Sequence, residues 1–438
     1  MLRKVLPAAV AAALCAGLSP AAQAQTEVQW WHSMTGVNNE RVNNLAKGFS
    51  ASQNQCRVNA VFKGSYDDSM TAAIAAFRAG NAPHILQVYE VGTATMMYSK
   101  AIKPVAEVMR ESGATWDPKA YVPAVASYYT SPKGDIVSFP FNSSTTVFFW
   151  NKDAFKAAGL DPNTPPKTWS DVAAAAAKLK AAGHKCPLTT SWQTWTQLES
   201  FSAWHNTEFA TKNNGFGGLD ARLAINSPLH VRHIENLANL AKQGIFVYGG
   251  RGSTGDAKFS SGECAMTMAS SAIYGLTKST LKAEFGISTL PYYADVQGAP
   301  QNTVIGGASL WVMSGKKKEE NQCVGRFFAY LSQPEIQAKW HQDTGYLPIT
   351  VAAYELTKKS GFYEKNPGTD VSVQQMIVKT TDKSRGLRLG NMNPIRAIME
   401  EELEYVWGGK KTAKQALDDA VRRGNEQLER FQKMSGSK

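Results

Sequence analysis

Three tryptophans lie close together in a segment rich in serine and threonine. Trp192, Trp195 and Trp204 fall within thirteen residues. Indole rings can pack on the C–H edges of a polyol while neighbouring hydroxyl and amide groups bind its oxygens. A buried core cluster would have the same spacing. The segment therefore indicates either a polyol site or a tryptophan-rich core, with equal weight.

Motifs that would carry out catalysis are not found along the chain. Segments 249–258 and 314–318 lack the glycine-lysine-hydroxyl spacing of a nucleotide-binding loop. Residues 307–311 begin like the turn of a nucleophilic serine but lack its second glycine, so Ser309 is expected to be an ordinary strand residue. We therefore expect a binding protein with no catalytic residue and no cofactor.

Histidine and cysteine spacing gives no metal site. His230 and His233 form the only close histidine pair, and without a nearby acidic ligand they are expected on an exposed helical face. The cysteines beyond residue 24 contain no C-x-x-C pair. In an oxidising compartment they could form disulfides in three pairings, and free buried thiols are an equal alternative. These cysteines are Cys56, Cys186, Cys264 and Cys323.

The first twenty-four residues have the pattern of a cleavable secretory signal. A basic start at Arg3 and Lys4 precedes an apolar stretch over 5–18, and a small-x-small site ends at Ala24. The apolar stretch is too short to span a bilayer. Cys15 would carry a lipid only if a small residue preceded it, and Leu14 is not small. We expect an exported protein beginning near residue 25, without an anchor.

Charge and length limit the class of partner. The formal charge is +11 at pH 7 over 438 residues, which is enough chain for two or three domains. The basic residues are dispersed, and the densest run, 316–318, is followed by Glu319 and Glu320, which is typical of a solvated helix start. No nucleic-acid partner is expected. The basic excess suits an anionic small ligand, although solubility explains it equally well.

Strand-like and helix-like patterns alternate in the first part of the chain. Strands are predicted at 28–31, 58–63 and 84–88. Helices are predicted from Val37 and after a cap at Ser65 or Asp67, the second with Met70, Ile74 and Phe77 on its apolar face. This alternation predicts a mostly parallel sheet. Ligands bind beyond the carboxyl ends of such strands, which here are loops 32–36, 64–66 and 89–93.

A second α/β unit is predicted further along. Residues 128–140 have the pattern of a hairpin turning at 132–135, and 147–150 that of a strand. A capping box at Thr168 precedes a helix over 170–182 that Gly183 ends. Residues 246–256 form a glycine-rich loop. Thr412, with Gln415, is predicted to begin a last amphipathic helix.

Several segments taken together resemble the extracellular solute-binding proteins that feed ABC importers. The similarity extends in order over nearly the whole chain after residue 24, at 149–153, 157–161, 165–169, 259–266, 306–307 and 345–348. Longer runs are similar to the sn-glycerol-3-phosphate-binding subfamily, at 31–34, 82–83, 87–97, 141–145, 301–302 and 386–392. The chain departs from that pattern at Thr146 and after Ser271.

The resemblance implies an α/β, two-lobed periplasmic-binding-protein fold, like that of maltose-binding protein (type II), with a hinge that the chain crosses three times. The implied lobes are 25–141 with 293–345, and 142–292 with 346–438; the hinge lies near 140–145, 290–293 and 345–349. The implied ligand positions are Tyr66, Glu90, Ser144, Trp192, Trp195, Ser270, Gly307, Tyr346 and Arg396. Ser271 is the alternative to Ser270.

The chemistry of these positions suggests a polarised site. Arg396 offers a planar charged fork for phosphate oxygens, whereas Glu90 would repel phosphate and is expected at the opposite end, accepting hydrogen bonds from glycerol hydroxyls. Trp192 and Trp195 would cover the carbon chain between them. The hydroxyl-bearing positions would donate hydrogen bonds, and Gly307 would let a backbone N–H approach closely. Tyr66, at a predicted helix start, would lie where the helix dipole favours an anion.

The resemblance implies a monomeric periplasmic receptor that captures glycerol 3-phosphate and delivers it to the transmembrane subunits of an ABC permease. Glycerophosphodiesters such as glycerophosphocholine are further candidate ligands. One alternative is a receptor for neutral sugars or oligosaccharides, which the tryptophans would also suit. A second alternative, a periplasmic phosphodiesterase, would need a metal or a nucleophile, and neither is found in the sequence.

Overall fold

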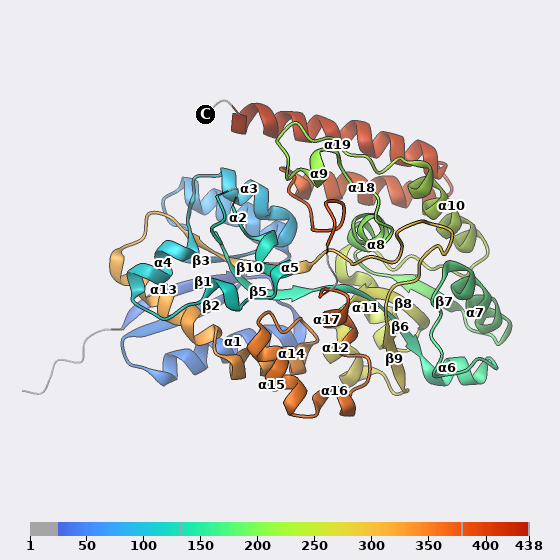
Figure 1. The fold of residues 1–438 in the computed structure, drawn as a ribbon, viewed down its shortest axis with the longest axis horizontal. Helices are drawn as coiled ribbons and strands as arrows, with labels where there is room; N and C mark the ends of the chain where they lie inside the picture. Colours follow the sequence, from blue (N-terminus) through green and yellow to red (C-terminus); the bar gives the residue numbers. More distant parts are fainter. Residues whose placement is uncertain (1–24, 132, 378–379, 437–438) are drawn as a thin grey trace, which may run out of the picture.

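Two β-sheets organise the protein, which is described here from a computed structural model covering residues 25–131, 133–377 and 380–436. Figure 1 shows strands β1–β3 and β10 on the left and β6–β9 on the right, with β5 directed from one group toward the other. We call the two groups the β1 sheet and the β6 sheet. The predicted secretory signal, at 1–24, lies outside the described residues.

The β1 sheet has six strands in the order β2-β1-β3-β10-β4, with β5 also paired to β10. Strands β1, β2 and β3 are parallel, as the sequence predicts, but β10 is antiparallel to all its neighbours, so the predicted mostly parallel sheet is mixed. The strands are β1 Thr26–His32, β2 Cys56–Phe62, β3 Ile85–Tyr89, β4 Ile102–Lys103, β5 Phe139–Ser144 and β10 Gly306–Met313. Ser309 is a buried residue of β10, which confirms its prediction as an ordinary strand residue.

The β6 sheet has four strands in the order β7-β8-β6-β9, with only β7 and β8 parallel. Its strands are β6 Thr146–Asn151, β7 Cys186–Thr190, β8 Cys264–Ser270 and β9 Phe285–Ser288. A single residue, Thr145, separates β5 of one sheet from β6 of the other. The chain therefore passes from the β1 sheet to the β6 sheet without a loop.

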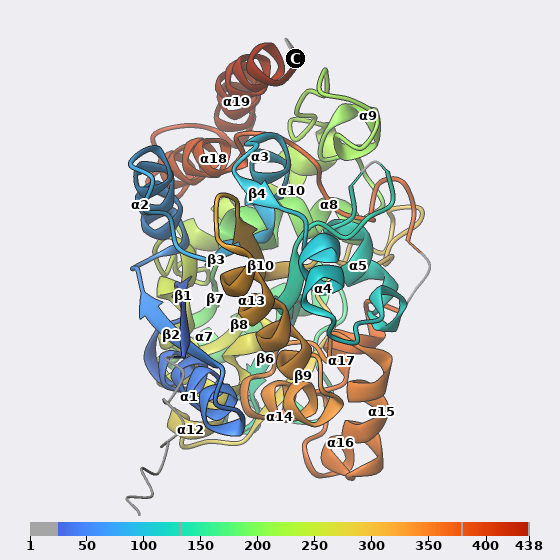
Figure 2. The ribbon, with the colours of Figure 1, turned by 90° about the vertical axis from the view of Figure 1, so that its left-hand side faces the viewer.

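Helices cover the faces of both sheets. Figure 2, turned to bring the β1 sheet forward, has α18 and α19 at the top and α14–α16 at the opposite end. The helices are α1 Gly36–Ser52, α2 Tyr66–Arg78, α3 Thr93–Tyr98, α4 Val105–Ser112, α5 Pro123–Tyr128, α6 Lys152–Ala157, α7 Trp169–Ala181, α8 Ser200–Trp204, α9 Thr211–Asn214, α10 Pro228–Lys242, α11 Asp256–Ser260, α12 Tyr274–Thr280, α13 Lys318–Leu331, α14 Pro334–Thr344, α15 Val351–Lys359, α16 Phe362–Lys365, α17 Val371–Gln374, α18 Met392–Trp407 and α19 Ala413–Gly436.

The predicted capping signals begin helices where expected. Ser65 forms a capping box with Asp68 at the start of α2, and Thr168 does so with Asp171 at the start of α7. Thr412 and Gln415 bond each other's backbone at the start of α19. These signals succeed because each depends only on residues within one helical turn.

Two local predictions were wrong, and a third holds in part. Ile74 and Phe77 are exposed, because α2 buries Ser69, Met70 and Ala73 instead. The predicted hairpin is short: Thr130 pairs with Ile136 in an antiparallel bridge, and α5 occupies the residues before it; Pro132 of its turn lies outside the described residues. The prediction of exposed histidines also fails.

His230 and His233 are fully buried, because buried polar groups of the core satisfy their ring nitrogens. His230 bonds the hydroxyls of Ser202 and Ser227, and His233 bonds Gln197 Oε1 at 2.9 Å. Burial lowers the pKa of His230 to about 3, so it is neutral at physiological pH. These residues are core histidines.

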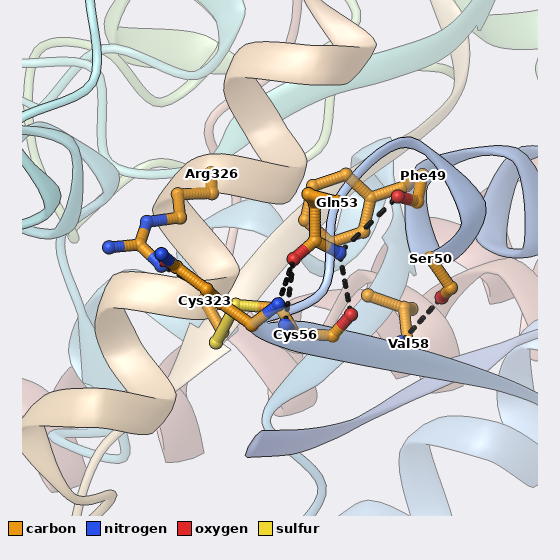
Figure 3. Close-up of a disulfide and its surroundings, with 8 residues drawn as sticks. Phe49, Ser50, Gln53, Cys56, Val58, Cys323 and Arg326 are labelled. Carbon is orange, nitrogen blue, oxygen red and sulfur yellow. Dashed lines mark hydrogen bonds between the residues drawn. A yellow bond between two sulfur atoms is a disulfide. The ribbon is translucent and has the colours of Figure 1, made fainter. Parts of the chain in front are cut away.

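The cysteines form two disulfides, which settles the pairing that the sequence left open. Cys56 of β2 bonds Cys323 of α13, and Cys186 bonds Cys264 between the adjacent strands β7 and β8. Figure 3 shows the first, with the Gln53 side chain bonded to both backbone groups of Cys56. Each disulfide joins elements of one sheet region, so neither ties the two sheets together.

The predicted lobe boundaries, which remain a prediction, can be compared with the packing of side chains on the two sheets. Residues 142–292 include all strands of the β6 sheet. Residues 25–141 and 293–345 include the strands of the β1 sheet, except for the end of β5 at 142–144. Leu347, Ile349, Val373 and Met376 belong to the hydrophobic cluster under the β1 sheet. Val371 instead packs with the cluster of the β6 sheet, and Gln375 donates to the Thr146 carbonyl of β6, so the segment 347–376 contacts both sheet regions.

Within the described ranges, no helix combines the length and the apolar character that crossing a membrane requires.

Candidate functional site

A cavity of about 460 Å³ lies where loops of the two sheets meet. The β1 sheet contributes residues 33–38, 64–66 and 89–90, which overlap all three loops that the sequence predicts as ligand-binding. The cavity is lined by all nine predicted ligand positions: Tyr66, Glu90, Ser144, Trp192, Trp195, Ser270, Gly307, Tyr346 and Arg396. The fold therefore brings together residues that lie up to 330 positions apart in the chain.

Tyr66 is held by an aromatic neighbour and by a chain of amide groups. Its ring stacks on Tyr89 with centroids 5.0 Å apart. Asn142 donates to its hydroxyl oxygen at 3.1 Å, and Gln87 donates to Asn142 at 2.8 Å. Burial raises the pKa of Tyr66 well above its ordinary value, so the hydroxyl keeps its proton. Tyr66 can therefore donate a hydrogen bond within the cavity.

The start of α2 is already supplied with negative charge. Helix α2 begins at Tyr66, as predicted. Its first turn carries Asp67 and Asp68, and the Asp68 carboxylate accepts hydrogen bonds from the Ser65 backbone and hydroxyl. The helix dipole is thus offset by the chain's own carboxylates, which weakens the predicted role of this terminus in holding an anion.

Trp192 and Trp195 line the cavity from an irregular turn. Trp192 has φ +49°, a left-handed conformation that is costly for a bulky side chain, and Trp195 begins a π-helical turn ending at Glu199. Such turns often mark functional sites. The Trp195 Nε1 is buried without a hydrogen-bond partner among described residues, so it is a donor available to a ligand.

Trp204, the third tryptophan of the cluster, has a different role. It is buried in the hydrophobic core and donates to the Leu290 carbonyl at 3.1 Å. The two interpretations of the tryptophan cluster therefore each apply to part of it: Trp204 is core, and Trp192 and Trp195 border a cavity.

Two adjacent glycines let aromatic and backbone groups approach closely. A Cβ on Gly306 would lie 2.3 Å from the Trp195 ring, and one on Gly307 would lie 1.8 Å from the Asn142 carbonyl oxygen. Gly307 also has φ +85°. Contact with β5 thus already requires glycine at position 307, in addition to any ligand approach.

Arg396 of α18 forms an ion-paired group with two glutamates. Its Nε and Nη2 donate to the two Glu199 carboxylate oxygens at 2.8 and 2.7 Å, and Nη2 also donates to Glu90. All three side chains are buried. None of the hydrogen bonds that Arg396 makes with described residues uses Nη1.

Burial and charge act in opposite directions on this group. Burial raises the pKa of Glu90 to about 7, even though Arg396 lowers it. Burial alone would lower the pKa of Arg396, but the charges of Glu199 and Glu90 hold it well above its ordinary value. The group therefore contains one permanent positive charge and, at neutral pH, between one and two negative charges.

The predicted opposite placement of Arg396 and Glu90 is wrong, because these side chains are hydrogen-bonded to each other. A guanidinium that already pairs with two carboxylates presents little net positive charge. The sequence could not reveal this because Glu199, the second carboxylate, lies outside every segment that carries the family resemblance.

Three further hydroxyl-bearing residues line the cavity. Ser144 ends β5, Ser270 ends β8, and Tyr346 follows α14. Ser144 pairs with Gly306 across the β1 sheet, and Ser270 pairs with Thr146 across the β6 sheet. Ser271 does not line the cavity, so the structure places Ser270 rather than its alternative there.

Two residues that the sequence interpretation did not single out also belong to this region. Glu199 holds Arg396, and Asp256 lines the cavity from the start of α11. Asp256 lies within the predicted glycine-rich loop, which was its only sequence signal. Among the residues that the structure describes, no cluster of histidine, cysteine or carboxylate side chains has the composition to hold a metal ion.

Comparisons with known proteins agree with this architecture. Residues 44–370 match the model of the bacterial extracellular solute-binding proteins. The sn-glycerol-3-phosphate-binding periplasmic protein UgpB of Escherichia coli O1:K1 / APEC is 54% identical over 431 residues, 98% of each chain. The protein of the same name from Yersinia enterocolitica serotype O:8 is 53% identical over 425 residues, 97% of each chain.

Solved structures with lower identity bear out the fold. UgpB from Mycobacterium tuberculosis, in complex with glycerophosphocholine, has a TM-score of 0.79 at 19% identity, covering 93% of this chain and 99% of that one. The cyclic alpha-maltosyl-1,6-maltose binding protein from Arthrobacter globiformis has a TM-score of 0.73 at 22% identity, covering 92% and 99%. The predicted maltose-binding-protein-like fold is confirmed, and the chain belongs to the bacterial extracellular solute-binding protein family.

Proposed function

We propose that this protein is the periplasmic substrate-binding component of an ABC importer and that its cavity binds sn-glycerol 3-phosphate. The observation that carries the proposal is the 53–54% identity to proteins named for that ligand, over 98% of the chain. The cavity supports it, because hydroxyl donors, an indole N–H and a buried ion-paired group surround one small volume.

The ligand orientation that the charges favour places the phosphate at the hydroxyl groups of Ser144, Ser270 and Tyr346. These neutral donors, with the Trp195 indole N–H, can bind phosphate oxygens without a nearby carboxylate pair. The glycerol hydroxyls would then lie at Glu90 and Arg396, which offer an acceptor and the unused Nη1 donor. In this orientation Glu90 lies at the glycerol end, as the sequence predicts, and Arg396 lies at that same end instead of at the phosphate.

Capture would follow from relative motion of two lobes about the β5–β6 crossover. Thr145 alone separates β5 of one sheet from β6 of the other, and neither disulfide ties the sheets together. Ligand contacts made by both lobes would stabilise a closed form, which the transmembrane subunits of the permease would recognise. The protein would act as a monomer, exported by a cleavable signal at 1–24, and would perform no chemistry on the ligand.

Calorimetry with the protein beginning at residue 25 tests the proposal. Glycerol 3-phosphate is expected to bind, and maltose is not; the reverse result would overturn the proposal in favour of a sugar receptor. Ligand is also expected to change tryptophan fluorescence, through Trp192 and Trp195. Release of choline from glycerophosphocholine by the purified protein would instead support a phosphodiesterase.

Matched serine variants test the orientation. Ser144→Ala removes a donor that lines the cavity, whereas Ser143→Ala removes a buried hydroxyl on the same strand that does not line it. A hydrogen bond to a charged group contributes about 1.5–3 kcal/mol, or roughly 10- to 150-fold in affinity. We expect that loss for Ser144→Ala and less than about threefold for Ser143→Ala. Equal effects would contradict the proposed phosphate position.

A further inference from the structure

The charges that line the cavity do not suit a fully ionised phosphate. Among the described residues that line it, Arg396 is the only lysine or arginine, and the carboxylates are Glu90 and Asp256. Glu199 lies behind Arg396 and takes two of its hydrogen bonds. A phosphate monoester carries close to two negative charges above its second pKa of about 6. A proton taken up together with such a ligand would offset part of this negative charge.

Asp256 lines the cavity close enough to Tyr346 for its charge to act on that hydroxyl. Its Oδ1 accepts a hydrogen bond from the Ser191 hydroxyl, directly after β7. The preceding residue, Gly255, packs on the Thr190 carbonyl, where a Cβ would lie 2.5 Å from the oxygen. Strands β7 and β8 are neighbours, and β8 ends at Ser270. Asp256 is thus fixed against the end of β7, the strand beside the one that supplies Ser270.

No cation balances Asp256 among the described residues. The nearest basic residues along the chain bond elsewhere: Arg251 pairs with Glu404, and Lys258 with Glu263. Burial raises the pKa of Asp256 to about 7, against the smaller lowering by Ser191. The charge of Asp256 also acts on Tyr346, whose pKa burial raises to about 12. The carboxyl can therefore hold a proton near neutral pH, which few aspartates do.

The other titratable groups of the cavity do not replace it. Glu90 can also hold a proton, but it faces Arg396 and the glycerol end of the proposed ligand position. Tyr66 and Tyr89 have pKa values raised by burial and remain neutral. Among the described lining residues, only Asp256 has a carboxyl oxygen, Oδ2, that bonds no described residue and also lies close enough to Tyr346 to affect its hydroxyl.

We propose that Asp256 is a specificity-determining residue that shares one proton with the ligand's phosphate group, forming an O–H···O hydrogen bond between its Oδ2 and a phosphate oxygen. No covalent bond to phosphorus forms or breaks. The proton comes from solvent, or from the ligand when its phosphate is singly protonated. The proposal rests on the proposed function. It makes the cavity selective for a phosphate that is bound together with one proton.

Proton uptake on binding is the direct measure of this sharing. Calorimetry of glycerol 3-phosphate binding is run from pH 6 to 9 in buffers of different ionisation enthalpy. For the wild-type protein we expect uptake approaching one proton at pH 8, and affinity falling by up to tenfold per pH unit above pH 7. Asp256→Asn keeps an acceptor for Ser191 but cannot carry the proton. In that variant we expect the Asp256-dependent slope and uptake to disappear, while binding persists.

The controls separate this inference from the proposed function. Asp295→Asn changes an exposed aspartate that pairs with Arg232 outside the cavity, and wild-type behaviour is expected. Glu90 is intact in Asp256→Asn, so any uptake by Glu90 persists and the difference between the proteins belongs to Asp256. Three results would overturn this inference but not the proposed function. These are the same proton uptake in the wild type and in Asp256→Asn, no proton uptake in the wild type, and loss of binding by a folded Asp256→Asn protein. Failure of the wild type to bind any glycerol phosphate would overturn the proposed function and this inference with it.

Discussion

Replacing Arg396 by alanine leaves two buried carboxylates without their shared counter-charge. In the wild type, Glu199 holds the guanidinium with two hydrogen bonds and Glu90 adds a third. Only 1% of Glu199 and 3% of Glu90 is exposed, so water cannot replace the lost charge. Breaking a buried ion pair by removing one partner costs about 3–5 kcal/mol. We expect Arg396→Ala to lose that much unfolding free energy at pH 7.5, without any ligand present.

The pH dependence identifies the cause of the loss. Without Arg396, the folded-state pKa of Glu90 rises further above the value of about 4.3 in the unfolded chain. A group whose pKa is raised by folding contributes stability that is present below its unfolded pKa and lost as pH rises through its folded pKa. The penalty of Arg396→Ala should therefore shrink at pH 5, where protons replace the missing charge.

Urea unfolding at pH 7.5 and pH 5.0 measures both quantities. A triple variant, Arg396→Met with Glu90→Gln and Glu199→Gln, removes all the charges together and should recover most of the loss at pH 7.5. Equal penalties for Arg396→Ala at the two pH values, or a loss below about 1 kcal/mol at pH 7.5, would refute the view that Arg396 is a structural counter-charge.

Two further predictions concern the whole molecule. The free energy of unfolding should be greatest between about pH 6 and 7. Burial raises the pKa of Glu90, Asp256 and Glu400 to about 7, so the stability that these carboxyl groups contribute is lost as pH rises to that value. Burial lowers the pKa of several histidines, so the stability that they contribute is lost as pH falls from about 6.5 toward 4. Thermal unfolding from pH 4.5 to 8.5 checks this, and a monotonic curve would contradict it. Removing Cys56 and Cys323 together should cost more unfolding free energy than removing Cys186 and Cys264, by about 1 kcal/mol, because the closed loops span 267 and 78 residues. Urea unfolding measures the two losses of unfolding free energy. Ligand affinity should change by less than about threefold in both double variants. A larger loss for the Cys186–Cys264 pair would show that chain entropy is not the cause.

Features set within a few residues could be predicted from the sequence. Ser65 and Thr168 cap helices through contacts inside one turn, and the first three strands were recognised by their own β-prone residues. Ile74 and Phe77 failed the same kind of reasoning, because the face that α2 buries depends on the sheet below it. The periodicity of a helix gives an apolar face but does not say whether a neighbour covers it.

Relations between distant residues needed the structure. The disulfide pairing depends on β2 lying beside α13, which no spacing reveals. The nine proposed ligand positions came from family resemblance, and their gathering in one cavity is a property of the fold. The prediction that Arg396 and Glu90 lie at opposite ends of the site is wrong because it considers only which ligand group each side chain could bind. It does not include Glu199, whose carboxylate also holds Arg396.

The pairing of Arg396 with Glu90 also bears on how a ligand could be held. Arg396 lies on α18 with Glu199 in the β6 sheet region, and Glu90 directly follows β3 of the β1 sheet, so this ion pair joins the two regions. A glycerol hydroxyl can donate to Glu90 and accept from Arg396 at once, which preserves the link with the ligand included. A bare anion cannot donate to Glu90 and would have to compete for the guanidinium. The same geometry that disfavours phosphate at Arg396 thus favours hydroxyl groups there, in agreement with the proposed ligand orientation.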